Sequence, residues 1–257
     1  MSDQVREFYK TLASNYHFIF ADWHKSIARQ SEVLDKLLRR YLSDDAYSVL
    51  DCACGIGTQA LGLAMRGWEV HATDLSAEAV ERAQAEAEAL GLKMTFGVAD
   101  FRTLRQTVPG TYDAVIACDN AIAHLQTPLD LTQSLDNMAS KLAPGGVLLL
   151  SLRDYDKTVQ EKPRSTMPVI HDDDGQRTIV FQVWDWHPDA TGYRLNHFTV
   201  KQQGEAYQTI NAVSDLRAWQ RADISAALER IGLSDIIWHM PESSGFYQPI
   251  VTARKSA

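Results

Sequence analysis

The sequence has no long apolar run, no cluster of lysine and arginine, and only three cysteines among its 257 residues. A membrane-spanning helix needs about 20 consecutive apolar residues, so we expect no membrane partner. The net charge of −8 at pH 7 argues against nucleic acid as a partner, because nucleic acid is bound through basic patches. Three cysteines without the spacing of zinc ligands predict free thiols, no metal site and a cytoplasmic location.

The most informative motif in the sequence is a glycine-containing stretch over residues 49–60. A short apolar run ends at Asp51, Gly55 and Gly57 then frame a turn, and a helical pattern begins near Thr58. This order predicts the first strand, turn and helix of a doubly wound, Rossmann-like α/β domain. Glycine allows close ligand approach, and a helix N-terminus attracts a carboxylate or a phosphate. The stretch is therefore a candidate ligand site.

Polar and aromatic residues follow each later predicted strand. Asp74 ends the second strand at about the spacing from which an acid binds ribose hydroxyls, although it can also help to start the helix after Ser76. Asp100 and Phe101 follow the third strand, where they can meet an adenine edge and face. The ends of the fourth and fifth strands carry Asn120, His124, Arg153 and Tyr155. Because open α/β sheets bind ligands at these strand ends, we expect one shared site.

The periodicity divides the chain into three parts. Residues 1–42 are predicted to form an N-terminal helical cap or lid, with a helical pattern over 5–40. Residues 43–162 and 214–257 are predicted to form the α/β core, with a helix over 216–231. Residues 163–213 alternate without intervening helices, which predicts an antiparallel β insertion over the substrate pocket.

The ordered motifs resemble those of the class I S-adenosylmethionine-dependent methyltransferases. The shared features are Asp51-x-Ala53-Cys54-Gly55-x-Gly57, then Asp74, then Asp100-Phe101, then Pro144-Gly145-Gly146 before a strand. Two further motifs, Asn120-x-x-x-His124-Leu125 and Arg153-Asp154-Tyr155-Asp156, are similar to the glycine and glycine/sarcosine N-methyltransferases. Arg29-Gln30-Ser31-Glu32 also resembles the Arg-x-x-Glu helix start of that branch.

The resemblance implies an enzyme that transfers a methyl group in line from S-adenosylmethionine to a small amino-acid-like amine and releases S-adenosylhomocysteine. From the residues and the resemblance together, the candidate donor-binding residues are Tyr16, Trp23, Arg29, Asp51, Ala53, Gly55, Gly57, Asp74, Leu75, Asp100, Phe101 and Cys118, with Tyr16 or Trp23 proposed to contact the sulfonium cation. The residues that the resemblance implies for the acceptor are Asn120, Arg153, Tyr155 and Tyr16, with His124 and Asn120 as catalytic candidates. A homo-oligomer is possible.

Simpler roles compete with these assignments. Tyr16 and Trp23 are possible core aromatics, Arg29 a possible surface residue, and His124 a possible structural histidine. An arginine at position 153 can also pair with Asp154, Asp156 or the acidic run 172–174.

Other functions also remain open at this point. The acceptor can instead be the nitrogen or oxygen of a heteroaromatic or another natural product, or the chain can bind the donor without turnover. A different class of enzyme, an NAD-dependent oxidoreductase, loosely fits Gly55-x-Gly57-x-x-Ala60 followed by Asp74.

Overall fold

The computed structural model describes residues 3–173 and 175–256. Residues 1 and 2 of the predicted lid, residue 174 of the predicted insertion and residue 257 of the predicted core lie outside the described residues. The elements in chain order are α1 (Asp3–Leu12), η1 (Tyr16–Ile19), α2 (Trp23–Tyr41), β1 (Ser48–Asp51), α3 (Thr58–Met65), β2 (Glu69–Asp74), α4 (Ala77–Ala89), β3 (Thr95–Val98), α5 (Leu104–Thr107), β4 (Tyr112–Ala117), η2 (Ala121–His124), α6 (Pro128–Ser140), β5 (Leu142–Ser151), α7 (Tyr155–Glu161), β6 (Val169–Asp173), β7 (Gln176–Trp186), β8 (Gly192–Gln203), β9 (Ala206–Arg217), α8 (Arg221–Arg230), β10 (Ser234–His239), α9 (Pro241–Ser244) and β11 (Ile250–Arg254).

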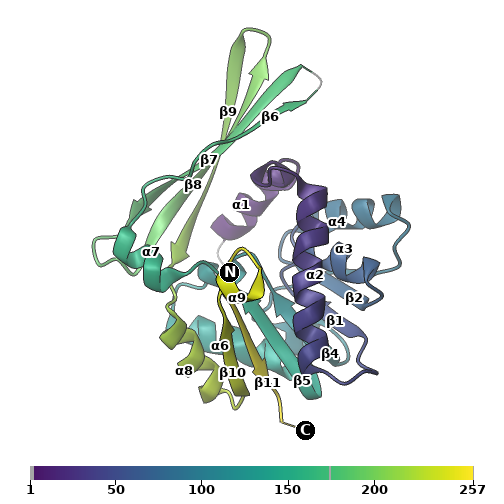
Figure 1. Ribbon diagram of the computed structural model, residues 1–257. Coiled ribbons are helices and arrows are strands. Elements are labelled where there is room, and N and C mark those ends of the chain that lie inside the picture. The colour runs from purple at the N-terminus through teal and green to yellow at the C-terminus, as the bar shows by residue number, and fades with distance from the viewer. Residues whose placement is uncertain (1–2, 174, 257) are drawn as a thin grey trace.

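A seven-stranded sheet in the order β10-β11-β5-β4-β1-β2-β3 forms the centre of the molecule (Figure 1). Strands β1 to β5 are parallel, and β11 and β10 close one edge with antiparallel pairing. The chain proceeds outward from β1 to β3 and then returns to place β4 on the other side of β1. This reversal creates a crevice beyond the carboxyl ends of β1 and β4, the usual ligand site of such sheets.

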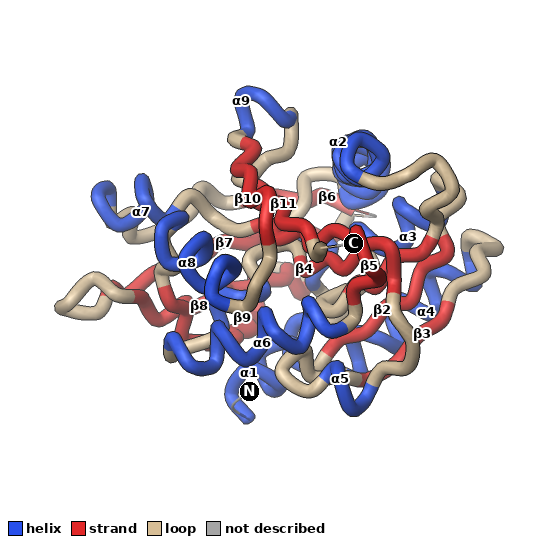
Figure 2. Tube along the Cα trace, turned by 90° about the horizontal axis from the view of Figure 1, so that it is seen from below, coloured by secondary structure: helices blue, strands red, loops and turns tan. Residues whose placement is uncertain are grey.

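Helices cover both faces of this sheet (Figure 2). Val49 packs in a cluster with α2 and α3, whereas the next residue, Leu50, packs in a cluster with α6 and α8. Successive side chains of a strand point to opposite faces, so a strand that is covered on both faces is apolar at every position. This explains the continuous apolar run of residues 147–150.

The N-terminal region is helical, but it is not continuous. The prediction of one helical segment over 5–40 is wrong between α1 and α2, where η1 intervenes. Helix α1 packs against β9 and α2 packs against α3, so the two helices follow different surfaces. The Asp22 side chain accepts a hydrogen bond from the Lys25 N–H and starts α2. Arg29 therefore lies inside α2, and the expectation that it starts a helix is wrong.

A second, antiparallel sheet in the order β6-β7-β8-β9 follows β5 and α7. One end of this sheet lies near α1, and the other end extends away from the core (Figure 1). Strand β9 continues to Arg217, so the helix predicted over 216–231 begins later, at Arg221. The Gln220 N–H donates to the Asp223 carboxylate at 3.0 Å and fixes that start. None of the described helices is both long and apolar enough to cross a membrane.

Candidate active site

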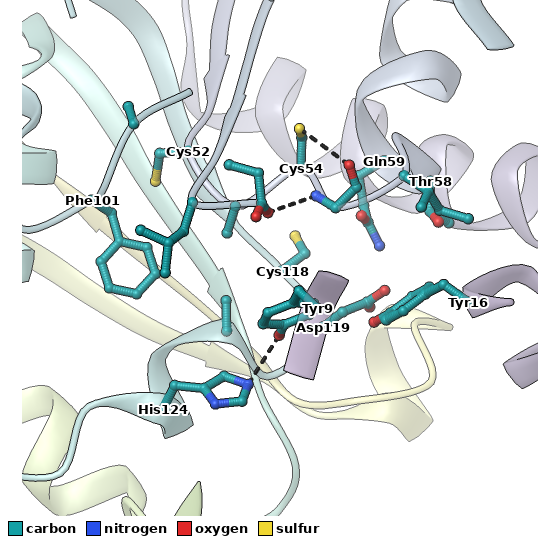
Figure 3. Close-up of a pocket in the computed structure, with 17 residues that line it drawn as sticks. Tyr9, Tyr16, Cys52, Cys54, Thr58, Gln59, Phe101, Cys118, Asp119 and His124 are labelled. Carbon is teal, nitrogen blue, oxygen red and sulfur yellow. Dashed lines mark hydrogen bonds between the residues drawn. The ribbon is translucent and has the colours of Figure 1, made fainter. Parts of the chain in front are cut away.

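A first cavity lies at the carboxyl ends of β1 to β4. Its lining comes from the turns that follow these strands and from the N-terminal segment. The lining residues are Tyr9, Tyr16, Cys52, Ala53, Cys54, Gly55, Ile56, Thr58, Gln59, Asp74, Leu75, Ala99, Phe101, Cys118, Asp119, Ala121 and His124. Figure 3 shows Tyr9, Tyr16, Asp119 and His124 on one side, opposite the turn that carries Cys52, Cys54 and Thr58.

The turn between β1 and α3 is built for close approach. Gly57 has a φ of 95°, and a Cβ there would lie 3.0 Å from Leu61 Cγ and 3.3 Å from Ala83 Cβ. Its N–H donates to the Cys54 carbonyl at 2.8 Å, and α3 begins at the next residue. The first turn of α3 therefore presents its free N–H groups at the cavity, a favourable position for an anion.

Asp74 joins two of these turns. Its Oδ2 accepts a hydrogen bond from the Gly55 N–H at 2.9 Å, and its Oδ1 accepts one from the Ser76 N–H at 2.9 Å. Burial raises the pKa of this carboxyl, while backbone hydrogen bonds from Ser76, Gly55 and Leu75 lower it. The helix-starting role expected for Asp74 is present, and the side chain also lines the first cavity. Each oxygen retains a lone pair for a ligand.

Asp51 lies beneath the turn and does not line the cavity. Its Oδ1 accepts a hydrogen bond from the Ala53 N–H at 3.2 Å, and its buried Oδ2 has no partner among the described atoms. Burial raises the pKa of Asp51 to about 8, and the nearby Asp74 and Asp119 carboxyls add to that shift. The side chain therefore holds the turn in a largely protonated form at neutral pH.

The other predicted donor residues divide into two groups. Five of them, Tyr16, Ala53, Leu75, Phe101 and Cys118, line the first cavity together with Gly55 and Asp74. Trp23 lies behind the lining and donates to the Thr58 hydroxyl at 2.9 Å. The Asp100 carboxylate accepts from Arg102 at 2.7 Å.

A second cavity adjoins the first. Its lining residues are Phe8, Tyr9, Leu12, Tyr16, Ile19, Phe20, Arg29, Gln30, Asp119, Asn120, His124, Arg153, Gln182, Leu195, His197, Leu216, Tyr247 and Gln248. The two cavities share Tyr9, Tyr16, Asp119 and His124. These four side chains therefore mark the place where two bound molecules would meet.

Arg153 faces the second cavity with uncharged partners. Its guanidinium donates to the Tyr193 hydroxyl at 2.7 Å and to Gln182 Oε1 at 3.0 Å, and it lies 4.5 Å from the centre of the Trp184 ring. No carboxylate among the described residues lies within ion-pair distance of it. The cation is thus positioned but not neutralised.

A different arginine takes the pairing that was considered for Arg153. Arg221 lies 2.9 Å from the Asp154 carboxylate and 3.4 Å from the Asp156 carboxylate. Within the acidic run 172–174, Asp172 pairs with Arg177 at 2.7 Å, and Asp174 lies outside the described residues.

Asn120 and Tyr155 support Arg153 from two sides. Asn120 Oδ1 accepts a hydrogen bond from the Arg153 N–H at 3.2 Å, which ties the end of β4 to the end of β5. Tyr155 is buried, and its hydroxyl lies 3.3 Å from the hydroxyl of Tyr193. Asn120 lines the second cavity, whereas Tyr155 lies behind it.

His124 lies between two hydroxyl groups. Its Nε2 is 3.0 Å from the Tyr9 hydroxyl, and its Nδ1 is 3.0 Å from the Ser214 hydroxyl. Burial, with a smaller contribution from the charge of Arg153, lowers the pKa of His124 to about 3. The imidazole is therefore neutral at pH 7 and joins α1 to β9.

Several polar residues of the second cavity were not among the predicted site residues, and three of them lie close to Arg153 or Asn120 in the chain or in space. Asp119 lies next to the predicted Asn120, so its position after β4 was an available signal. Gln182 and His197 come from β7 and β8, where strand alternation gives no hint of a site. Burial lowers the pKa of His197 to about 4, and its Nε2 has no partner among the described atoms.

Comparisons with known proteins agree with this arrangement. A family model described as a methyltransferase domain matches residues 49–146. The glycine/sarcosine N-methyltransferase of Halorhodospira halochloris is 26% identical over 218 residues, which cover 78% of this chain and 79% of that protein. The crystal structure of DesVI from Streptomyces venezuelae is similar with a TM-score of 0.76 and 18% identity, over 91% of this chain and 93% of the other.

An amino pentose methyltransferase of Micromonospora echinaspora, solved with bound S-adenosylmethionine, is similar over 95% of both chains, with a TM-score of 0.72 and 19% identity. The solved structures establish the fold. The matched residues 49–146 run from β1 into β5 and include most of the first cavity. Residues 49–146 thus carry a methyltransferase domain, and the chain is an enzyme whose methyl donor is S-adenosylmethionine.

Proposed function

We propose that the enzyme methylates the nitrogen of a small, amino-acid-like amine. The observation that carries this proposal is Arg153, whose guanidinium is held at the second cavity by Tyr193 and Gln182 without a carboxylate partner among the described residues. A guanidinium fork binds a carboxylate with two parallel hydrogen bonds. Names of relatives support the same acceptor class, since the Halorhodospira halochloris protein is a glycine/sarcosine N-methyltransferase.

The first cavity suits the methyl donor. The N-terminus of α3 can receive the carboxylate of the donor, Asp74 can bind its ribose hydroxyls, and Phe101 can pack against its adenine. Tyr16 lies where a sulfonium cation would meet an aromatic face. When bound, the donor supplies an electrophilic methyl group on positively charged sulfur.

The remaining predicted residues act from behind the lining in this proposal. Asp51 and Gly57 hold the turn, Trp23 holds Thr58, and Asp100 is fixed by Arg102 beside the adenine position. Arg29 lines the second cavity, so in this proposal it approaches the donor from the acceptor side.

Positioning accounts for much of the expected catalysis. An in-line displacement requires the nitrogen lone pair, the methyl carbon and the sulfur to be aligned. Holding two reactants in such a geometry contributes roughly 7–11 kcal/mol. Arg153 anchors one end of the acceptor in the second cavity, and the residues shared with the first cavity surround the other end.

The direct test is methyl transfer from labelled S-adenosylmethionine to a panel of amino acids, N-methyl amino acids, amino sugars and heteroaromatic amines. We expect turnover with amines that carry a carboxylate. Arg153→Lys retains the charge but loses the fork, so the acceptor KM should rise about tenfold or more while donor affinity stays within about twofold. Arg221→Lys is the matched control, because Arg221 pairs with Asp154 and Asp156 outside both cavities, and it should leave the acceptor KM unchanged.

A larger natural-product amine is a second candidate acceptor. Apolar and aromatic side chains, Phe8, Leu12, Ile19 and Phe20, line part of the second cavity, and they favour an acceptor with an apolar body. Efficient turnover of an amine without an anionic group would contradict the assignment of Arg153 and would favour this candidate.

A further inference from the structure

Asp119 occupies an unusual position directly after β4. It and Asn120 have φ values of 55° and 70°, so two consecutive residues adopt the left-handed conformation. This conformation is uncommon outside glycine, although Asp and Asn tolerate it best. The Asp119 N–H donates to Ser151 Oγ at 3.0 Å, and the Asn120 N–H donates to the Ser151 carbonyl at 3.0 Å. These bonds hold the Asp119 side chain where it lines both cavities.

The Asp119 carboxylate has hydrogen-bond donors but no ion-pair partner among the described residues. The Tyr247 hydroxyl donates to its Oδ1, and the Gln59 side chain also hydrogen-bonds to it. Burial raises the pKa of Asp119 to about 6, and the Gln59 hydrogen bond and the Arg153 charge partly offset that shift. The group is therefore an anion at neutral pH and a proton acceptor with a pKa near working conditions.

We propose that Asp119 binds the amino group of the acceptor and takes one of its protons before methyl transfer. This inference rests on the proposed function and adds a proton acceptor to it. Arg153 and Asp119 line the same second cavity, and each is held by uncharged groups rather than by the other. A zwitterion complements this pair, with its carboxylate on Arg153 and its ammonium group on Asp119.

The step balances without another reactant. One N–H bond of the ammonium group breaks, its electron pair remains on nitrogen, and the proton forms an O–H bond on Asp119. The freed lone pair forms a bond to the methyl carbon as the carbon–sulfur bond breaks and its electrons remain on sulfur. The product leaves as a methylated ammonium ion together with S-adenosylhomocysteine, and Asp119 returns its proton to solvent.

His124 is less suited to this role. Both of its ring nitrogens are already within hydrogen-bond distance of the Tyr9 and Ser214 hydroxyls. Burial lowers the pKa of His124 to about 3, which makes it a much weaker proton acceptor than Asp119. In this scheme His124 is a positioning residue that holds the Tyr9 hydroxyl at the junction of the two cavities.

Titration of Asp119 depends on every group that faces it. Those groups are Tyr9 and Tyr16 from the N-terminal segment, Asp51 and Asp74 at the ends of β1 and β2, Gln59 on α3, His124 on η2, Arg153 after β5 and Tyr247 before β11. Burial raises the pKa of both tyrosines, lowers that of His124 and raises that of Asp51 to about 8, so these four groups are all largely neutral near pH 6. Asp119 is therefore the group expected to define an acid limb near pH 6.

Asp119→Asn tests the proposal, because asparagine retains the shape and tolerates the left-handed backbone. With the best amine of the panel, kcat/KM should fall roughly 10²- to 10⁴-fold, and the acid limb near pH 6 should disappear. By calorimetry, S-adenosylhomocysteine should bind within about twofold of wild type, whereas binding of the amine to that complex should weaken at least tenfold. Asp156→Asn, at a half-buried carboxylate outside both cavities, is the matched control and should retain full activity.

Tyr247→Phe provides an independent measurement. It removes a hydrogen bond to the ionised carboxylate, so the acid limb should move to higher pH in this variant. An Asp119→Asn enzyme that keeps its kcat/KM and its acid limb would overturn the role of Asp119 while leaving the proposed function intact. Loss of S-adenosylhomocysteine binding in Asp119→Asn would also overturn it, by assigning the carboxylate to the donor. A wild-type enzyme that methylates no amine would instead contradict the proposed function itself.

Discussion

The two cavities are built in different ways. In the first cavity the key contacts join neighbouring turns: Asp74 and Gly55 are 19 residues apart in the chain, and Asp74 and Ser76 only two. In the second cavity they join distant segments: His124 and Ser214 are 90 residues apart, and Tyr9 and His124 are 115 apart. The contacts cited for the first cavity join a side chain to backbone N–H groups, whereas those cited for the second join two side chains.

Because of this difference, we expect the two cavities to tolerate amino-acid substitutions differently. Backbone N–H groups and a helix terminus persist through most substitutions, so we expect donor binding at the first cavity to survive changes elsewhere in the chain. The second cavity, the proposed acceptor side, is lined by individual side chains of β7, β8 and the N-terminal segment, and a substitution there changes its shape or charge. We therefore expect substitutions in the first cavity to change mainly donor affinity and substitutions in the second cavity to change mainly the acceptor KM.

Among variants that test donor binding and stability, the largest effect should come from Asp74→Ala. The change removes the acceptor of the Gly55 and Ser76 N–H groups and the proposed ribose ligand. Hydrogen bonds to a charged group contribute roughly 1.5–3 kcal/mol, so donor affinity should fall about ten- to a hundredfold. Calorimetry with S-adenosylhomocysteine measures this, with Asp156→Asn as a control. Unchanged donor affinity in a folded variant would contradict the assignment of the donor to the first cavity.

Asp51→Asn should change how stability depends on pH. Burial raises the pKa of Asp51 to about 8 in the folded chain, whereas the unfolded carboxyl releases its proton near pH 4. Between these values the folded chain holds the extra proton, so raising the pH lowers the free energy of unfolding by at most about 1.4 kcal/mol per pH unit. Urea unfolding should show that the free energy of unfolding falls less between pH 5 and pH 7 in Asp51→Asn than in wild type. Identical losses in both proteins would contradict the prediction.

His124→Gln should change the pH dependence of stability with the opposite sign. Burial lowers the pKa of His124 to about 3, and the unfolded side chain titrates near pH 6.5. As the pH falls below about 6.5 the unfolded chain binds a proton that the folded chain excludes, so wild type loses stability, by roughly 1–2 kcal/mol near pH 5. The glutamine variant should lose less over the same range. A steeper acid loss in the variant would count against this assignment.

The smallest effect should come from Tyr9→Phe, at the boundary of the two cavities. The change deletes the hydroxyl that lies 3.0 Å from His124 Nε2. A typical hydrogen bond contributes roughly 0.5–1.5 kcal/mol, so we expect a two- to tenfold rise in acceptor KM with donor affinity nearly unchanged. An equal loss of affinity for donor and acceptor would show that the Tyr9 hydroxyl contributes equally to binding in both cavities.

The contrast also explains how much of the site could be predicted from sequence. The order of strands, turns and helices in the core follows from local patterns, and these placed Gly55, Asp74 and Phe101 at the first cavity. The same patterns could not show that Asp51 and Gly57 support the turn from behind its lining, because that depends on how the turn packs.

The second cavity was harder to predict for a physical reason. Gln182 and His197 lie directly opposite each other across β7 and β8, and only the register of this pairing brings them together beside Arg153. Alternation of apolar and polar residues fixes which face of a strand is buried, but it does not fix which residues of two strands meet. The break between α1 and α2 has a similar origin, since it follows from the different surfaces on which these helices pack.

The position of the N-terminal segment has a consequence for the order of events in turnover. Tyr9 and Tyr16 both come from this segment, and each lines both cavities. If this segment acts as the predicted lid, one movement of α1 and η1 opens the routes to both cavities at once, and its closure traps both bound molecules together. If that movement is slower than the chemistry, as it is in many enzymes, different acceptors will share one maximal turnover rate and differ only in the concentration that half-saturates the enzyme.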